Sequence, residues 1–116
     1  MSKLTTLLYV DDESINLRIF EINFRSRYRV ITAESGYDGI KILSSEPDIT
    51  VVISDMRMPG MDGLEFIQQA KNSFPNVIFF ILTGYDITEE IEGALKNSLI
   101  NRYFKKPFNI KEIDNA

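Results

Sequence analysis

The sequence predicts a doubly wound α/β domain, in which a five-stranded parallel sheet carries helices on both faces. One observation behind this prediction is that short, almost wholly apolar runs alternate with amphipathic segments of helical length. Strands that are apolar on both faces are typical of parallel sheets covered on both sides. The other is that acids, a hydroxyl and a lysine follow four of the runs, at the strand ends where such sheets bind ligands.

Five apolar runs rich in β-branched and aromatic residues are predicted as strands. They comprise residues 7–10, 28–33, 51–54, 77–82 and 100–104. Turn residues bound these runs, with Pro59 and Gly60 after the third and Pro75 and Asn76 before the fourth. Because crossovers between parallel strands are right-handed, this order of elements favours helices on both sides of the sheet.

The segments between the strands have apolar residues at helical spacing. Residues 14–25 carry two neighbouring apolar stripes, and residues 35–44 form a helix that Gly36 and Gly39 weaken. Residues 64–72 are predicted as the third helix. The two stripes of the first helix are Ile15, Ile19 and Ile22, and beside them Leu17, Phe20 and Phe24.

The last two helices begin with capping signals, in which an acid or amide side chain precedes a glutamate by three residues. These signals are Asp86 with Glu89, opening a helix to about residue 97, and Asn109 with Glu112. The fifth helix reaches the end of the sequence after about two turns. We therefore expect residues 1–116 to be one domain, either the amino-terminal domain of a longer protein or a piece trimmed from one.

The composition indicates one globular domain and excludes several kinds of site. The net charge of −4, from 13 basic and 17 acidic residues, disfavours non-specific binding to nucleic acid or to an anionic membrane. The absence of Cys and His excludes disulfides, thiolate or histidine metal sites and a histidine-based triad. No apolar stretch approaches the roughly 20 residues of a membrane span and no signal peptide is visible, so we expect a cytoplasmic protein.

Four polar stretches at the ends of apolar runs carry the chemistry of the chain. Asp11 and Asp12 follow the first strand, and Asp55, Thr83 and Lys106 follow the third, fourth and fifth. Because parallel strands end at the same edge of a sheet, we expect these side chains to converge. Crowded carboxylates favour a divalent cation, whereas a lysine and a threonine favour an anion. Together they indicate phosphoryl transfer to a carboxylate.

Four motifs at these strand ends resemble one known family when they are taken as an ordered set. They are DDE at 11–13, SDMRMPGMDG at 54–63, LTG at 82–84 and KPF at 106–108. The set resembles the receiver domain of response regulators, the phosphoacceptor module of two-component phosphorelay signalling, and the resemblance extends from residue 7 to about residue 113. It implies a flavodoxin-like, chemotaxis-regulator-like sheet with strand order 2-1-3-4-5.

The resemblance implies a phosphorylation site beside a magnesium site. Asp55 matches the phosphorylated aspartate, and a carboxylate held rigidly at a strand end is suited to in-line attack on phosphorus. Asp12 and Asp55 are then direct Mg²⁺ ligands together with the backbone carbonyl of Arg57, and Asp11 acts through water. Mg²⁺ commonly takes one or two carboxylates along with waters and phosphate oxygens, which fits this set.

Further residues match those that bind the phosphoryl oxygens. The hydroxyl of Thr83 donates to one oxygen, and Gly84 leaves the approach to the phosphate open. Lys106 matches the phosphate-binding lysine, because it directly precedes a proline and strand alternation turns Lys105 to the opposite face. The resemblance also implies a cis peptide bond before Pro107.

The resemblance also implies a conformational switch. Thr83 moves toward the phosphate and vacates space for the ring of Tyr103, which changes the face formed by the fourth helix, the last strand and the fifth helix. Arg57 and Tyr85 lie two residues after Asp55 and Thr83, at positions where the family tunes the loss of the phosphate. We expect these two side chains to shield the acyl phosphate.

These features predict a signalling switch that accepts a phosphoryl group from a sensor histidine kinase or a phosphotransfer protein. The chain has no histidine, so the phosphohistidine must belong to another molecule. The switch face is a candidate homodimer surface, and we expect no direct contact with nucleic acid or membrane. The chain is expected to catalyse only its own phosphorylation and dephosphorylation, and so not to be an enzyme in the usual sense.

Three alternatives are kept beside this function. A receiver-like scaffold that works without phosphorylation would share the fold, although every site position is filled here. An aspartyl-phosphate phosphatase of the haloacid dehalogenase class needs a second acid two residues after the nucleophile, where this chain has Arg57. A flavodoxin-like FMN module needs a glycine-rich phosphate loop after the first strand, where acids stand. Met56, Met58 and Met61 are interpreted as loop packing.

Overall fold

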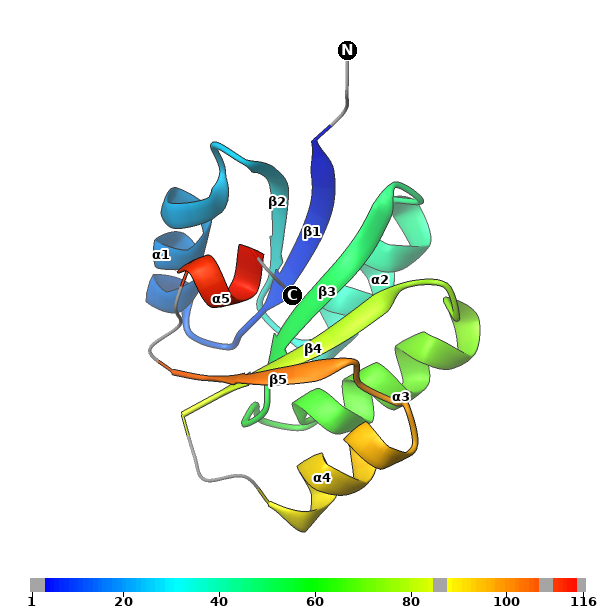
Figure 1. The fold of residues 1–116 in the computed structure, drawn as a ribbon. Helices are drawn as coiled ribbons and strands as arrows, with labels where there is room; N and C mark the ends of the chain where they lie inside the picture. The colour runs from blue at the N-terminus through cyan, green and yellow to red at the C-terminus, as the bar shows by residue number, and fades with distance from the viewer. Residues whose placement is uncertain (1–3, 85–87, 107–109, 115–116) are drawn as a thin grey trace.

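The fold is a parallel five-stranded sheet between two layers of helices (Figure 1). The computed structural model describes residues 4–84, 88–106 and 110–114. All neighbouring strands pair in parallel in the order β2-β1-β3-β4-β5, which confirms the predicted doubly wound sheet and its strand order. The strands are β1 (Thr5–Val10), β2 (Tyr28–Ala33), β3 (Ile49–Asp55), β4 (Ile78–Thr83) and β5 (Arg102–Lys105).

Strands β3 and β4 each extend one residue further toward the polar rim than the sequence predicts. β3 begins at Ile49 and continues to Asp55, which pairs with Leu82 of β4. β4 likewise continues to Thr83, which pairs with Lys105 of β5. Parallel pairing uses backbone groups, so a polar side chain does not end a strand when the neighbouring backbone is still present. Asp55 and Thr83 are therefore held by the sheet itself.

Two helices cover one face of the sheet and three cover the other (Figure 1). α1 and α5 pack on the face that carries Leu7, Ile53 and Phe104, and the other helices pack on the face of Leu8 and Val52. No helix in the described part of the chain is long and apolar enough to cross a membrane. The helices are α1 (Ser14–Phe24), α2 (Gly36–Ser45), α3 (Gly63–Ser73), α4 (Glu89–Lys96) and α5 (Ile110–Asp114).

Helix α1 buries only one of its two apolar stripes. The stripe of Leu17, Phe20 and Phe24 is buried against the sheet. The isoleucine stripe faces outward, with exposed fractions of 64, 45 and 54% along the helix. Both stripes satisfy helical spacing, so the pattern alone does not choose between them. The aromatic rings bury more area each, and Phe20 stacks on Tyr9 of β1.

Gly36 and Gly39 let α2 approach α3 closely, which corrects their interpretation as mere weak points of the helix. A Cβ on Gly36 would lie 2.7 Å from Sδ of Met61, and a Cβ on Gly39 would lie 2.8 Å from the ring of Phe66. Non-bonded heavy atoms prefer separations of about 3.5–4.0 Å, so a side chain at either position would have to displace its neighbours. The helix propensity lost at the glycines is offset by packing between the helices.

The start of α4 differs from the prediction. Oγ1 of Thr88 accepts a hydrogen bond from the N–H of Ile91 at 3.3 Å, so the helix begins at Glu89. A threonine at this position satisfies one of the free N–H groups of the first turn, which fixes the boundary. The predicted caps Asp86 of this helix and Asn109 of α5 lie outside the described residues.

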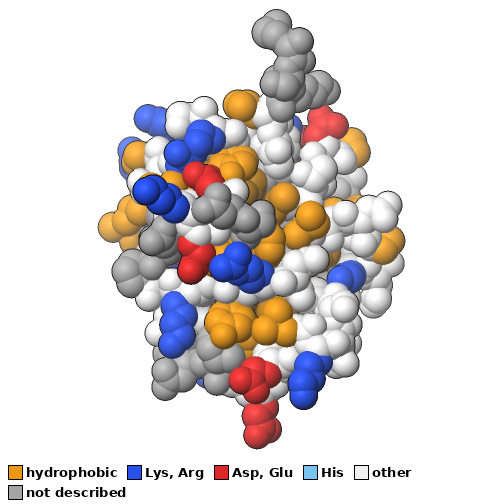
Figure 2. All heavy atoms as spheres, in the orientation of Figure 1, with side chains coloured by type: hydrophobic (Ala, Val, Ile, Leu, Met, Phe, Trp, Pro, Cys, Tyr) orange, Lys and Arg blue, Asp and Glu red, His pale blue; other side chains and the backbone are white. Residues whose placement is uncertain are grey.

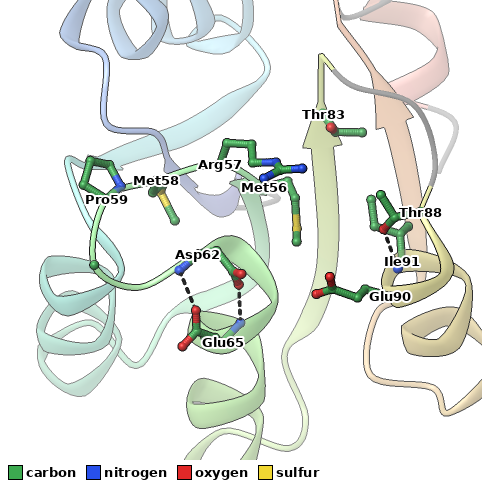
Figure 3. A pocket seen from close by; sticks show the side chains of 11 residues that line it. Met56, Arg57, Met58, Pro59, Asp62, Glu65, Thr83, Thr88, Glu90 and Ile91 are labelled. Carbon is green, nitrogen blue, oxygen red and sulfur yellow. Dashed lines mark hydrogen bonds between the residues drawn. The ribbon is translucent and has the colours of Figure 1, made fainter.

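Helix α3 begins with a capping box that the sequence analysis missed (Figure 3). Oδ1 of Asp62 accepts a hydrogen bond from the N–H of Glu65 at 2.9 Å, and Oε1 of Glu65 accepts one from the N–H of Asp62 at 3.3 Å. The acid–acid spacing of three residues is the signal that could have found it. This box fixes the far end of the loop that follows Asp55.

A hollow lies between helix α5 and the strands beneath it. Its volume is about 270 Å³, and hydrophobic side chains gather there over the strands (Figure 2). The hydroxyl of Tyr28 donates to Oδ1 of Asp114 at 2.7 Å, which fastens α5 to β2. The apolar residues that line the hollow are Leu7, Val51, Ile53, Phe80 and Ile113.

Candidate functional site

The carboxyl edge of the sheet brings the four polar stretches together. Asp11 directly follows β1, Asp55 ends β3, Thr83 ends β4 and Lys106 directly follows β5. The order of the strands reverses between β1 and β3, and sheets of this type bind ligands at such a point. The residues singled out by sequence therefore surround the place where a ligand is expected.

Three carboxylates form a cluster at this point. One oxygen each of Asp11, Asp12 and Asp55 lies within 4.8 Å of the others. Asp11 is fully buried and Asp55 is 6% exposed, whereas Asp12 is exposed. Hard oxygen donors that are partly open to solvent suit Mg²⁺, which keeps several waters when it binds a protein. The donor set therefore fits the predicted magnesium ion.

Lys106 bridges two of these carboxylates. Its Nζ lies 3.3 Å from Oδ2 of Asp11 and 3.3 Å from Oδ1 of Asp55. Its backbone N–H donates to the carbonyl of Thr83 at 2.8 Å, which holds the start of the loop after β5. Lys105 is exposed on the strand, so Lys106 is the one that the structure brings to the acids.

The buried charges shift each other's protonation. Burial raises the pKa of Asp55 above the ordinary value, Lys106 opposes this shift, and the charge of Asp11 adds to it. Burial also lowers the pKa of Lys106, but the carboxylates of Asp55 and Asp11 outweigh burial and leave that pKa raised. The ammonium therefore stays charged at neutral pH, as a group that binds an anion must.

Asp11 has more partners than the sequence analysis foresaw. The hydroxyl of Tyr9 donates to Oδ2 of Asp11 at 2.7 Å, and the N–H of Glu13 donates to Oδ1 at 3.0 Å. Tyr9 was missed because it lies inside an apolar run. The signal that could have found it is the strand period, since residues two apart in a strand face the same side.

Thr83 lies beside a cavity of about 470 Å³ between the loop after β3 and the start of α4 (Figure 3). Thr83 is fully buried. Arg57 extends from the loop toward β4, and Glu90 extends from α4 into the cavity. The interpretation of the methionines as packing residues is confirmed, since all three are buried in the core: Met56, Met58 and Met61.

Gly63 is a site residue that the sequence analysis quoted only within its motif. A Cβ at this position would lie 2.3 Å from the backbone oxygen of Asp55. The N–H of Gly63 donates to the carbonyl of Met56 at 2.8 Å. α3 therefore rests directly on the backbone of Asp55. By contrast, a Cβ at Gly84 would meet the Lys106 side chain at 3.7 Å, an ordinary contact distance.

Tyr103 lies on the same face of the sheet as Thr83. It pairs in register with Ile81, two residues before Thr83, and it is half-buried against the core cluster under α3 and α4. The structure thus places the two predicted switch residues on neighbouring strands. Tyr85 and Pro107, the other predicted modulating and cis-proline residues, lie outside the described residues.

Comparisons with known proteins agree with this geometry. The chain is 32% identical over 112 residues to the sporulation initiation phosphotransferase F of Bacillus subtilis, covering 95% of this chain and 88% of that protein. Among other curated relatives, the chain spans only 22% and 30% of two transcriptional regulatory proteins.

Solved structures share the fold over almost the whole chain. The adenylate cyclase structure from Rhodopirellula baltica has a TM-score of 0.92 and 31% identity, covering 98% of this chain and 84% of that chain. The response regulator TrrA of Thermotoga maritima, in complex with Mg(2+)-BeF, has a TM-score of 0.82 and 26% identity, covering 97% of this chain and 95% of that chain. The family model described as the response regulator receiver domain matches residues 7–116, so the chain belongs to the response regulator receiver domains of two-component systems.

Proposed function

We propose that this chain is a phosphorylation-dependent signalling switch in which Asp55 accepts a phosphoryl group. The observation that carries the proposal is the ammonium of Lys106, which lies 3.3 Å from the carboxylates of both Asp11 and Asp55. An ammonium shared by two acids can neutralise the nucleophile before transfer and hold a phosphoryl oxygen afterwards. The family of the chain and the donor set of the acid cluster support the same function.

The donor in this proposal is the phosphohistidine of a sensor histidine kinase or a phosphotransfer protein. A carboxylate oxygen of Asp55 attacks phosphorus, so that a P–O bond forms while the P–N bond breaks and the imidazole nitrogen leaves with its electron pair. Lys106 and the Thr83 hydroxyl hold the equatorial oxygens, on which charge spreads during phosphoryl transfer. The donor histidine lies outside residues 1–116, which contain none.

The residues that would hold Mg²⁺ are Asp12, Asp55 and the carbonyl of Arg57 directly, with Asp11 acting through water. When bound, the ion supplies positive charge that lowers the repulsion between the acids and the incoming phosphoryl group. The similar structure of TrrA, which is in complex with Mg(2+)-BeF, supports this expectation for the present donor set.

The output in this proposal is a population shift of the face formed by α4, β5 and α5. Thr83 turns toward the phosphate, and Tyr103 fills the space that Thr83 leaves. That face is also our candidate homodimer surface. Arg57, Tyr85 and Gly84 set how easily water reaches the acyl phosphate, and hydrolysis resets the switch without turnover of a separate substrate.

The wider setting is proposed on the family alone. We infer a cytoplasmic location, where histidine kinases present their phosphohistidine, and no direct binding to nucleic acid. We also infer that residues 1–116 are the receiver domain of a longer protein or a piece trimmed from one.

Intact-mass spectrometry after incubation with acetyl phosphate and Mg²⁺ tests the proposal. We expect one phosphoryl adduct on the parent chain, and none on Asp55→Asn or in the presence of a chelator. Asp48→Asn is the matched control, because Asp48 is an exposed acid far from the site and its loss leaves the adduct unchanged.

The contrary outcomes separate the alternatives. An adduct that survives in Asp55→Asn would assign phosphorylation to another residue. No adduct on a folded chain that binds Mg²⁺ would favour the receiver-like scaffold that works without phosphorylation.

A further inference from the structure

Tyr9 is a buried polar residue that the proposed chemistry does not use. It lies on β1 and is 1% exposed, inside the cluster of apolar residues under α1 and α5. Its hydroxyl donates to Oδ2 of Asp11 at 2.7 Å, a short bond to a carboxylate that is itself fully buried. Hydrogen bonds to ionised acceptors are about twice as strong as those between neutral groups.

The ring of Tyr9 is held in place by α1. It stacks on Phe20 with ring centroids 4.1 Å apart and planes 12° from parallel, and Phe20 packs on Phe24 at 4.5 Å. A ring packed in this way has little freedom to turn, because protein interiors are close-packed. The hydroxyl therefore donates to Asp11 from a fixed position, and the loop after β1 does not have to move for this hydrogen bond to form.

The partners of Asp11 differ in whether another group competes for them. Oδ1 accepts the N–H of Glu13 at 3.0 Å, and Oδ2 is shared between Tyr9 and Lys106. Lys106 also faces Asp55, so an anion on Asp55 competes for the same ammonium. The single O–H of Tyr9 serves Asp11 alone. Once Lys106 turns to a phosphoryl group, Tyr9 is what still holds Oδ2.

We propose that Tyr9 is a positioning residue for the magnesium site, which acts by fixing the carboxylate of Asp11 through its hydroxyl. This inference rests on the proposed function, since it gives Asp11 a role toward the ion. Groups that orient a direct metal ligand through a hydrogen bond typically change metal affinity by about 10- to 100-fold when they are removed. Asp11 acts on the ion through water in the proposed function, so an effect at the lower end of that range is expected here.

The test compares two substitutions that each remove one hydroxyl. Tyr9→Phe breaks the bond to Asp11, and Tyr28→Phe breaks an equally short 2.7 Å bond to Asp114 at the far end of the molecule. Mg²⁺ is titrated into each ¹⁵N-labelled protein and the dissociation constant is taken from the amide shifts. We expect the constant to rise about tenfold in Tyr9→Phe and to stay unchanged in Tyr28→Phe.

A double-substitution cycle and a kinetic split separate positioning from general packing. In an Asp11→Ala background, Tyr9→Phe should weaken Mg²⁺ binding no further, because the acceptor of the Tyr9 hydroxyl is gone. Acetyl phosphate labelling of Tyr9→Phe should be slow at low Mg²⁺ and recover at saturating Mg²⁺. A dissociation constant within twofold of the parent, or an equal loss in the Asp11→Ala background, overturns the proposal.

A measurement on the unsubstituted chain tests the proposal even if the Tyr9→Phe variant does not fold. Saturation with Mg²⁺ should shift the ¹³Cζ resonance of Tyr9 and leave that of Tyr28 in place, and an unmoved Tyr9 resonance overturns the proposal. The titration uses no phosphoryl donor. If the parent binds Mg²⁺ but Asp55 is never phosphorylated, the proposed function fails while the role of Tyr9 is still decided by the titration.

Discussion

The two faces of the sheet are packed by different means. The face under α1 and α5 is filled largely by aromatic rings, which are Tyr9, Phe20, Phe24, Phe80 and Phe104. The face under α2, α3 and α4 is filled mainly by aliphatic and methionine side chains with the rings of Phe66 and Phe79, and glycines there admit very close contacts. The difference shows that the two acids of the site depend on opposite features. The carboxylate of Asp11 accepts a hydrogen bond from the hydroxyl of a large packed side chain, Tyr9. The backbone of Asp55 is instead contacted closely by Gly63, which has no side chain to keep α3 away.

The largest expected effect is on the aromatic face. Phe20→Ala removes a fully buried ring that stacks on Tyr9 and packs at a tilt against Phe24, and should lower the free energy of unfolding by about 4 kcal/mol. Ile19→Ala, on the exposed stripe of the same helix, should change it by less than about 0.5 kcal/mol. Denaturant unfolding of both variants checks this. Similar losses in the two variants would mean that α1 packs through its isoleucine stripe.

The close contacts of the other face are tested by adding one methyl group. Gly63→Ala places Cβ against the backbone oxygen of Asp55, and should cost about 3 kcal/mol because neither backbone can yield easily. Gly93→Ala is the matched control, since nothing lies within 4 Å of a Cβ there. That change should stabilise the chain by up to about 1 kcal/mol, because alanine favours the helix. Equal effects of the two substitutions in thermal unfolding would refute the close approach.

Much of this architecture could be predicted from sequence because its signals are local. An apolar run that ends in a polar residue indicates both a buried strand and the edge of the sheet at which that residue lies, so the positions of Asp55 and Thr83 could be predicted. The contacts that were missed depend on tertiary packing. The two apolar stripes on α1 have the same helical spacing, and only packing against the sheet determines which of them is buried. The role of Gly63 likewise depends on the contact between α3 and the backbone of Asp55.

At the rim where the two faces meet, the charge of Asp55 should cost stability. Burial raises its pKa, so the folded chain binds more protons than the unfolded chain between the two pKa values. The free energy of unfolding contributed by this group therefore falls as pH rises through that interval and stays low above it. Asp55→Asn should then stabilise the metal-free chain at pH 7 by about 1 kcal/mol.

The pH dependence of that gain is the decisive part of the measurement. Denaturant unfolding with a chelator, at pH 7 and near the unfolded pKa of about 4, should show the gain shrinking as the pH falls. The exposed acid Asp48 supplies the control, because Asp48→Asn should show no such change. A gain that is equal at both pH values would mean that burial does not strain the charge of Asp55.

The smallest expected effect on the free energy of unfolding concerns Ser98, a position after α4 at which the backbone conformation favours glycine but the chain has serine. Ser98 follows α4 with φ of 60°, a left-handed conformation that suits glycine, and Lys71 of α3 donates to its carbonyl. Ser98→Gly keeps that backbone bond and relieves the side chain, so it should raise the free energy of unfolding by about 0.5 kcal/mol. Ser44→Gly, inside α2, should lower it by a similar amount. Opposite signs in paired unfolding curves would show that glycine stabilises this face only where the backbone requires it, and equal signs would contradict that view.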